Sequence, residues 1–308
     1  MAKAKSNLLL CFDAFGTLFK PKHTVALQYA EGARQCGFTD FTDNELQSTL
    51  KTAIKDESKR NPNYGKATGL GATKWWTNVI RNTFTPLIRD GQALPTDLAP
   101  KLLHRFASKE GYDVEPGLVS TLRALKQQSS EMRFGQIVIG VVTNSDDRVP
   151  SILSSFGLNV SPLRYGTQIS EVDDGGKMFR TADYDIDFHC MSYDVGVEKP
   201  DKRIFESAEH MLAQVVAARE GKSTAAAEAD TKAWQKVYVG DEHAKDVVGA
   251  MNAGWDPVLL DADGASSDDD TSKLTDFYGQ TLAGSFKERA VLKVTSIREL
   301  VLWLTGKV

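Results

Sequence analysis

The sequence predicts a doubly wound α/β fold: a Rossmann-like parallel sheet with a helical domain inserted after its first strand. Three observations lead to this prediction. A short apolar run at residues 8–12 is typical of a buried strand. Residues 21–112 carry helical patterns, and beyond residue 116 helical segments alternate with apolar, strand-like ones. We therefore expect an α/β core of residues 1–20 and 113–308 and a helical cap domain of residues 21–112.

The helical block and the alternating part can each be followed along the chain. Apolar residues at helical spacing, interrupted by Gly and Pro, predict cap helices at residues 25–36, 43–55, 74–84 and 100–109. In the core, helical and strand-like segments alternate at residues 117–128, 137–143, 147–156, 188–193, 201–216, 236–240, 244–253, 257–260 and 296–304. Parallel strands need crossover connections, usually helical, so this alternation indicates a mostly parallel sheet.

Three core segments, at residues 165–183, 217–231 and 262–289, do not follow this alternation. They are rich in Gly, Ser, Asp, Ala and Lys, with weak apolar periodicity. We interpret them as surface insertions that are mobile and dispensable. The acidic run Asp268-Asp269-Asp270 lies in a Ser-rich part of the third, where a solvated loop is the expected structure rather than a cation site.

Composition excludes several classes of function. The chain has 308 residues, is 41% hydrophobic and carries a formal net charge of -4, so no basic field attracts nucleic acid or an anionic membrane. Its three cysteines are far apart and lack metal-ligand spacing. We expect a reduced, intracellular protein, cytoplasmic or nuclear. The first apolar run is too short for a secretory signal or a membrane span.

Asp13 is the candidate nucleophile. It directly follows the apolar run at residues 8–12 and enters a turn of small residues that contains Gly16 and Thr17. In open α/β sheets, ligands bind outside the carboxyl ends of the strands. A carboxylate at this position can attack a substrate and form a covalent intermediate.

Three further strand ends carry polar residues. The strand at 137–143 ends in Thr143 and Asn144 just before a helix, an arrangement that can cradle an anion. Lys199 precedes a Pro-Asp helix start, and the strand at 236–240 ends in Asp241, with Asp246 one turn later. Acids that converge in this way repel one another unless a cation intervenes, and hard oxygen ligands favour Mg²⁺.

These four segments, in this order, resemble the motifs of the haloacid dehalogenase superfamily of hydrolases. The resemblance implies that Asp13 forms an aspartyl intermediate and that Thr143 and Asn144 hold phosphoryl oxygens. It further implies that Lys199 neutralises the nucleophile and the phosphoryl group. The metal would be bound by Asp13, Asp241 and the main-chain carbonyl of Phe15, with Asp246 supporting the coordination shell.

Phe15 departs from the phosphatase pattern. Phosphatases of the superfamily have a second aspartate at this position, which protonates the leaving group, whereas its dehalogenases have an aromatic residue there. The cap residues Arg60-Asn61-Pro62-Asn63-Tyr64-Gly65 and Lys74-Trp75-Trp76 look like the haloacid dehalogenase-like hydrolase domain-containing protein 3 family, which also lacks the second aspartate. This resemblance covers the cap and the core to about residue 260.

Three functions remain open on the sequence. The first is a Mg²⁺-dependent phosphohydrolase that acts on a small phosphate ester or acyl phosphate through Asp13. The second is a binding or regulatory protein with little turnover, which the missing general acid favours. The third is a dehalogenase-like hydrolase, which Phe15 favours but Asp241 and Asp246 disfavour, because that chemistry needs no metal. His243, beside the last motif, is expected to face solvent or to pack rather than to act in catalysis.

Overall fold

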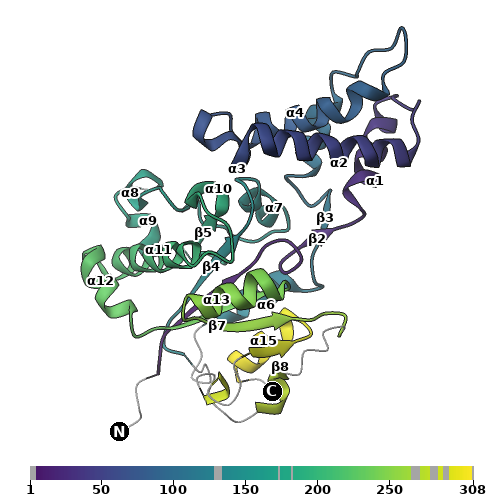
Figure 1. The fold of residues 1–308 in the computed structure, drawn as a ribbon. Helices are drawn as coiled ribbons and strands as arrows, with labels where there is room; N and C mark the ends of the chain where they lie inside the picture. The colour runs from purple at the N-terminus through teal and green to yellow at the C-terminus, as the bar shows by residue number, and fades with distance from the viewer. Residues whose placement is uncertain are drawn as a thin grey trace. The chain divides into compact units, whose positions relative to one another are not determined.

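The protein is described here by a computed structural model that covers residues 5–127, 134–172, 174–181, 183–264, 271–277, 284–286 and 291–306. The chain forms two compact units, drawn in Figure 1. The first unit consists of Met1–Phe19, Val114–Ser145 and Gly157–Val308, and the second of Lys20–Asp113 and Asp146–Phe156. The second unit thus includes residues 146–156, which the predicted cap did not. The assignment of residues 21–112 as a cap stays a prediction.

A seven-stranded sheet forms the centre of the first unit. Its order is β5-β4-β1-β6-β7-β9-β8, and all of its paired strands run parallel. The strands are β1 (Leu8–Phe12), β4 (Ile137–Thr143), β5 (Phe188–Met191), β6 (Gln235–Gly240), β7 (Asp256–Leu260), β8 (Thr271–Lys273) and β9 (Val291–Val294). The sheet and the helical insertion after β1 confirm the predicted fold class.

Strand β1 lies between β4 and β6, which explains its unbroken apolar sequence. Cys11 pairs with Gly140 of β4 on one side and with Tyr238 of β6 on the other. All five β1 residues are buried, as expected for a parallel strand covered on both faces. Leu9 and Cys11 belong to the core cluster that includes the helix at Arg203–Glu220, so the alternate residues point to the opposite face.

Helices of the first unit cover the sheet and complete the core. They are α6 (Leu118–Lys126), α8 (Ile169–Val172), α9 (Lys177–Thr181), α10 (Ser192–Val195), α11 (Arg203–Glu220), α12 (Thr224–Thr231), α13 (Val248–Asn252) and α15 (Ile297–Leu304), with a short π-helix η3 (His243–Val247) and a short 3₁₀ helix η4 (Leu274–Phe277). Helix α11 packs against β4 and β5, whereas α6 and α15 pack against each other (Figure 1).

The second unit is helical apart from one short two-stranded ribbon. Its elements are β2 (Lys20–Pro21), α1 (Val25–Gln35), α2 (Asp43–Arg60), α3 (Pro62–Gly65), η1 (Lys66–Thr68), α4 (Ala72–Phe84), η2 (Thr85–Leu87), α5 (Leu98–Arg105), β3 (Tyr112–Asp113) and α7 (Val149–Ser155). A capping box between Thr42 and Glu45 begins α2. The antiparallel pairing of β2 with β3 brings the two ends of segment 20–113 together.

The predicted surface insertions contribute to the fold more than their composition indicated. In segment 165–183, Ile169 and Phe179 are buried in the core cluster that includes α11. In segment 217–231, helix α12 buries Ala227 completely. Small or isolated apolar residues are enough to seat a short helix on an existing core, so these two segments are not confined to the surface. That they are mobile and dispensable stays a prediction.

The third insertion, residues 262–289, contains the edge strand β8, which pairs with β9. Both strands were missed from the sequence because each is short. Residues 268–270, the acidic run, lie outside the described residues. Within the part of the chain that the structure describes, no helix is long and apolar enough to cross a membrane.

Candidate functional site

Asp13 extends the centre of the sheet by one residue. Its backbone N–H donates to the carbonyl of Val239 at 2.9 Å, which continues the ladder between β1 and β6. The residue is 6% exposed, and its Oδ1 lies 2.8 Å from Lys199 Nζ. Oδ1 makes no hydrogen bond within the described residues, so this contact is an ion pair. A buried carboxylate oxygen without a hydrogen bond is free to accept one from, or to coordinate, a ligand.

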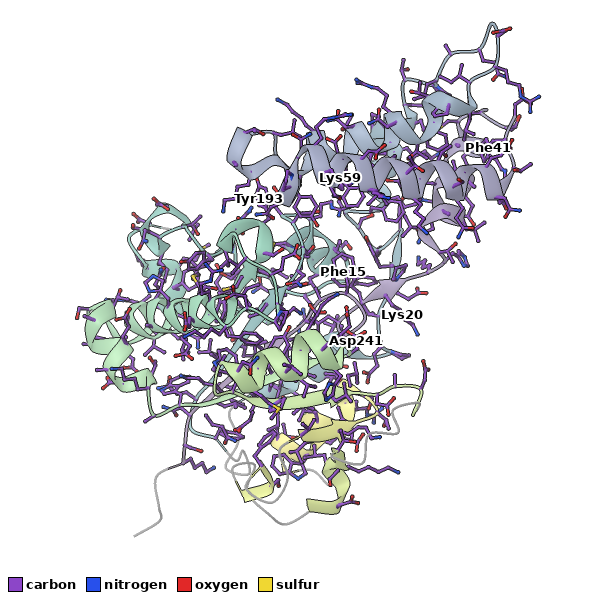
Figure 2. The ribbon with its side chains drawn as sticks, viewed as in Figure 1. Phe15, Lys20, Phe41, Lys59, Tyr193 and Asp241 are labelled. Carbon is purple, nitrogen blue, oxygen red and sulfur yellow. The ribbon has the colours of Figure 1, made fainter. Side chains whose placement is uncertain are left out.

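The turn after Asp13 is shaped around Asp241. Gly16 has φ of 85°, and a Cβ at this position would lie 2.2 Å from Asp241 Oδ2. Both the left-handed backbone and the close approach therefore require glycine. The Thr17 hydroxyl donates to Asp241 Oδ1 at 3.0 Å. Figure 2 labels Asp241 and Phe15, which come from the loops after β6 and β1. The ring of Phe15 packs edge-on against Phe19, with centroids 4.7 Å apart.

The Asp246 carboxylate accepts two hydrogen bonds and packs closely against Gly240. It lies in η3, is 1% exposed and accepts from the backbone N–H of Glu242 at 2.9 Å through Oδ2. Its Oδ1 accepts from Lys199 Nζ at 2.7 Å. A Cβ at Gly240 would lie 2.2 Å from Asp246 Oδ2, so the carboxylate occupies space that the missing side chain leaves open.

The three aspartates form one acidic cluster. Carboxylate oxygens of Asp13, Asp241 and Asp246 all lie within 4.8 Å of one another. Burial raises the pKa of Asp241, and the charges of Asp13 and Asp246 raise it further. Burial also raises the pKa of Asp246, against the opposing effect of Lys199. A divalent cation would remove this repulsion, and carboxylate oxygens are the ligands that Mg²⁺ prefers.

Lys199 is fixed at both its backbone and its side chain. The Asn144 side chain accepts from the Lys199 N–H at 2.7 Å and donates to its carbonyl at 3.1 Å. Nζ is 2.7 Å from both the Tyr238 hydroxyl and Asp246 Oδ1. The ammonium group is therefore buried in contact with two carboxylates and a phenol, which offsets the cost of removing it from water.

Asn144 thus has a contact that its predicted role did not include. The resemblance implied that its amide holds a phosphoryl oxygen, whereas here both polar atoms of the amide bind the backbone of Lys199. Thr143, 1% exposed, ends β4, and its carbonyl accepts from the N–H of Ser145 at 3.0 Å. Its role toward a phosphoryl group stays a prediction, as does metal coordination by the Phe15 carbonyl.

The remaining residues singled out in the sequence lie elsewhere. His243 is exposed in η3, as expected for a residue without a catalytic role. Trp75 is buried within the second unit, where its indole N–H donates to the Asn61 carbonyl at 3.0 Å. Trp76 of the same unit is half-buried, and its indole N–H donates to Asp146 Oδ2 at 2.8 Å.

Two members of the site were not assigned from the sequence. Thr17 belongs to the first motif but was given no role of its own, and Tyr238 was interpreted as one more apolar residue of its strand. A hydroxyl-bearing residue in a strand predicted to be buried on both faces is the signal that could have identified Tyr238, because a buried phenol normally has a hydrogen-bond partner. The partners themselves could not be inferred, since they come from distant segments.

Comparison with known proteins indicates one family for this chain. A model of the haloacid dehalogenase-like hydrolase family matches residues 8–254. A hydrolase of Schizosaccharomyces pombe, described as uncharacterized, is 29% identical over 258 residues, which cover 82% of this chain and 90% of that protein. Haloacid dehalogenase-like hydrolase domain-containing protein 3 of Bos taurus is 29% identical over 261 residues, covering 84% of each chain.

A solved structure agrees at the level of the fold. The crystal structure of a defluorinating L-2-haloacid dehalogenase superposes with a TM-score of 0.51 at 12% identity, covering 97% of this chain and 95% of the other. The family match extends from β1 to the residues after α13, and so includes Asp13, Lys199 and Asp241. The chain therefore belongs to the haloacid dehalogenase-like hydrolase family.

Proposed function

We propose that the protein is a Mg²⁺-dependent phosphohydrolase in which Asp13 is the nucleophile. The observation that carries this proposal is the position of Asp13, whose Oδ1 lies 2.8 Å from Lys199 Nζ within a cluster shared with Asp241 and Asp246. A fixed cation and three convergent carboxylates match what phosphoryl transfer needs, because that reaction depends mainly on positioning and charge stabilisation.

The residues of this site would divide the reaction between them. An Asp13 oxygen attacks phosphorus, the bond from phosphorus to the leaving oxygen breaks, and water later hydrolyses the aspartyl phosphate. Lys199 holds positive charge beside the nucleophile and the transferred group. Bound by Asp13 and Asp241, Mg²⁺ would neutralise further phosphate charge. Asp246, held by Lys199 and the N–H of Glu242, would support that coordination.

Phe15 limits which substrates can react. It cannot donate a proton, so a leaving group that departs as an alkoxide goes without assistance, at a cost of about 10²–10⁴-fold in rate. Acyl and aryl phosphates leave as weaker bases and lose less. We therefore infer that the substrate is a small acyl or aryl phosphate rather than an alkyl ester.

Turnover of acetyl phosphate and of p-nitrophenyl phosphate with Mg²⁺ tests the proposal. We expect Asp13→Asn to abolish both activities, and mass spectrometry to detect a phosphoryl group on Asp13 of the parent protein. Asp256→Asn is the matched control, because Asp256 begins β7 and so lies at the amino-terminal ends of the parallel strands, whereas Asp13 follows the carboxyl end of β1. Full activity of a contaminant-free Asp13→Asn preparation would contradict the nucleophile assignment.

A binding or regulatory protein is the second candidate, and the specific observation that favours it is the absence of a general acid at Phe15. The same preparations distinguish the two functions. Binding of Mg²⁺ with beryllium fluoride, but no turnover of either phosphate, would favour the binding protein. Dehalogenase activity ranks below both, because Asp241 and Asp246 are retained.

A further inference from the structure

Tyr238 connects β6 to β4 across β1, the strand that leads to the candidate nucleophile. It lies in β6, opposite Cys11 of β1, and is 1% exposed. Its hydroxyl donates to the carbonyl of Val142 in β4 at 2.6 Å. Because β1 separates β4 from β6 in the sheet, the tyrosine side chain spans β1 two residues before Asp13.

The direction of the hydrogen bonds at this phenol is determined. Burial raises the pKa of Tyr238 well above its usual value, and the charges of Asp13 and Asp246 add to the increase, so the hydroxyl keeps its single proton. That proton is directed to the Val142 carbonyl. The oxygen can therefore only accept from Lys199 Nζ, at 2.7 Å.

Lys199 Nζ thus has one neutral partner and two charged ones. The charged partners are Asp13, the predicted nucleophile, and Asp246, the predicted support of the metal. Both would change their interactions when a metal and a phosphoryl group bind, since Asp13 must turn an oxygen toward phosphorus. The hydroxyl of Tyr238 takes no part in either step, and its position is set by the Val142 carbonyl and by packing.

We propose that Tyr238 is a positioning residue for catalysis, which holds the Lys199 ammonium group in place while the contacts of the carboxylates change. This inference rests on the proposed function, because it assigns Lys199 a role in stabilising phosphoryl charge. Asn144 fixes the backbone of the same lysine, so the cation is anchored at both ends of its side chain. Preorganised charge of this kind is the largest contribution in many active sites.

Tyr238→Phe tests the proposal because it removes one oxygen and keeps the ring, which packs edge-on against Phe205. We expect kcat for acetyl phosphate to fall about tenfold, equivalent to one weakened hydrogen bond to a charged group, with KM nearly unchanged. The thermal midpoint should fall as well, because the buried Val142 carbonyl loses the hydroxyl that donates to it. Tyr184→Phe, which removes a hydroxyl from another buried tyrosine of the same unit, is the matched control and should retain the parent's kcat.

A double-mutant cycle separates positioning from a structural role. If Tyr238 acts through the ammonium group, Tyr238→Phe should have little further effect in a Lys199→Met background. An equal fractional loss of kcat in both backgrounds would overturn the proposal. The same cycle can be measured as affinity for beryllium fluoride with Mg²⁺, which requires no turnover.

The geometry can be tested even if the proposed function fails. A crystal structure of Tyr238→Phe should show Nζ displaced toward Asp13 or Asp246, and an unmoved Nζ would refute positioning by the phenol. If the parent protein has no phosphatase activity but Nζ is displaced in the variant, the proposed function is refuted and the positioning of Lys199 by Tyr238 is kept.

Discussion

Gly240→Ala should disrupt the acidic cluster through a steric effect alone. The new Cβ would lie 2.2 Å from Asp246 Oδ2 and 2.3 Å from its Cγ. Nonbonded atoms pack at roughly 3.5 Å, so the carboxylate must retreat by about 1 Å. The contacts to Lys199 Nζ at 2.7 Å and to the Glu242 N–H at 2.9 Å would then exceed hydrogen-bonding distance.

The loss of stability in Gly240→Ala can be worked out from these two hydrogen bonds. Each hydrogen bond to a charged group contributes about 1.5–3 kcal/mol, and part of that is recovered as the side chain finds other partners. We therefore expect the free energy of unfolding to fall by about 3 kcal/mol, as measured by urea denaturation. Mg²⁺ affinity, measured by calorimetry, should fall in parallel, because Asp246, the residue proposed to support the metal, has moved.

The control is the same substitution in a variant that lacks the Asp246 side chain. In an Asp246→Gly background the new methyl group meets neither the carboxylate nor the Asp246 Cβ, which would lie 2.5 Å away, so Gly240→Ala should cost well under 1 kcal/mol there. Equal costs in the two backgrounds would show that Gly240 is required for a reason other than the approach of Asp246, and the reasoning would fail.

Three further predictions concern pH, metal and leaving group. His189 is fully buried, and burial lowers its pKa to about 4. Stability should therefore decrease as the pH falls from 6.5 toward 4, by about 3 kcal/mol in urea titrations; a flat profile for the parent would refute this, and His189→Phe should lose the dependence. Mg²⁺ at 100 times its Kd should stabilise the protein by about 2.7 kcal/mol, and Asp241→Asn should abolish that shift in thermal unfolding. Phe15→Asp should accelerate hydrolysis of alkyl phosphates more than that of aryl phosphates, since only the alkoxide needs a proton; equal effects on both would favour the binding protein.

The sequence by itself determined the fold class, because apolar runs and helical periodicity reflect local burial. The fully buried strand before Asp13 and the alternation of helices and strands beyond residue 116 could be predicted in this way. The sequence also indicated that Asp13 and Asp241 lie at the carboxyl ends of strands, since polar residues that directly follow an apolar run lie there. Lys199 instead follows the short helix α10 and not a strand.

The tertiary structure decided how these side chains are paired. That Asn144 binds the backbone of Lys199, and that Tyr238 reaches across β1 to Val142, depends on strand order, which no local pattern encodes. The strands β8 and β9 escaped detection because they have only three and four residues, too few for a periodic signal, and are recognised by their pairing in the sheet. Long-range pairing, unlike local burial, leaves no periodic signal in a single sequence.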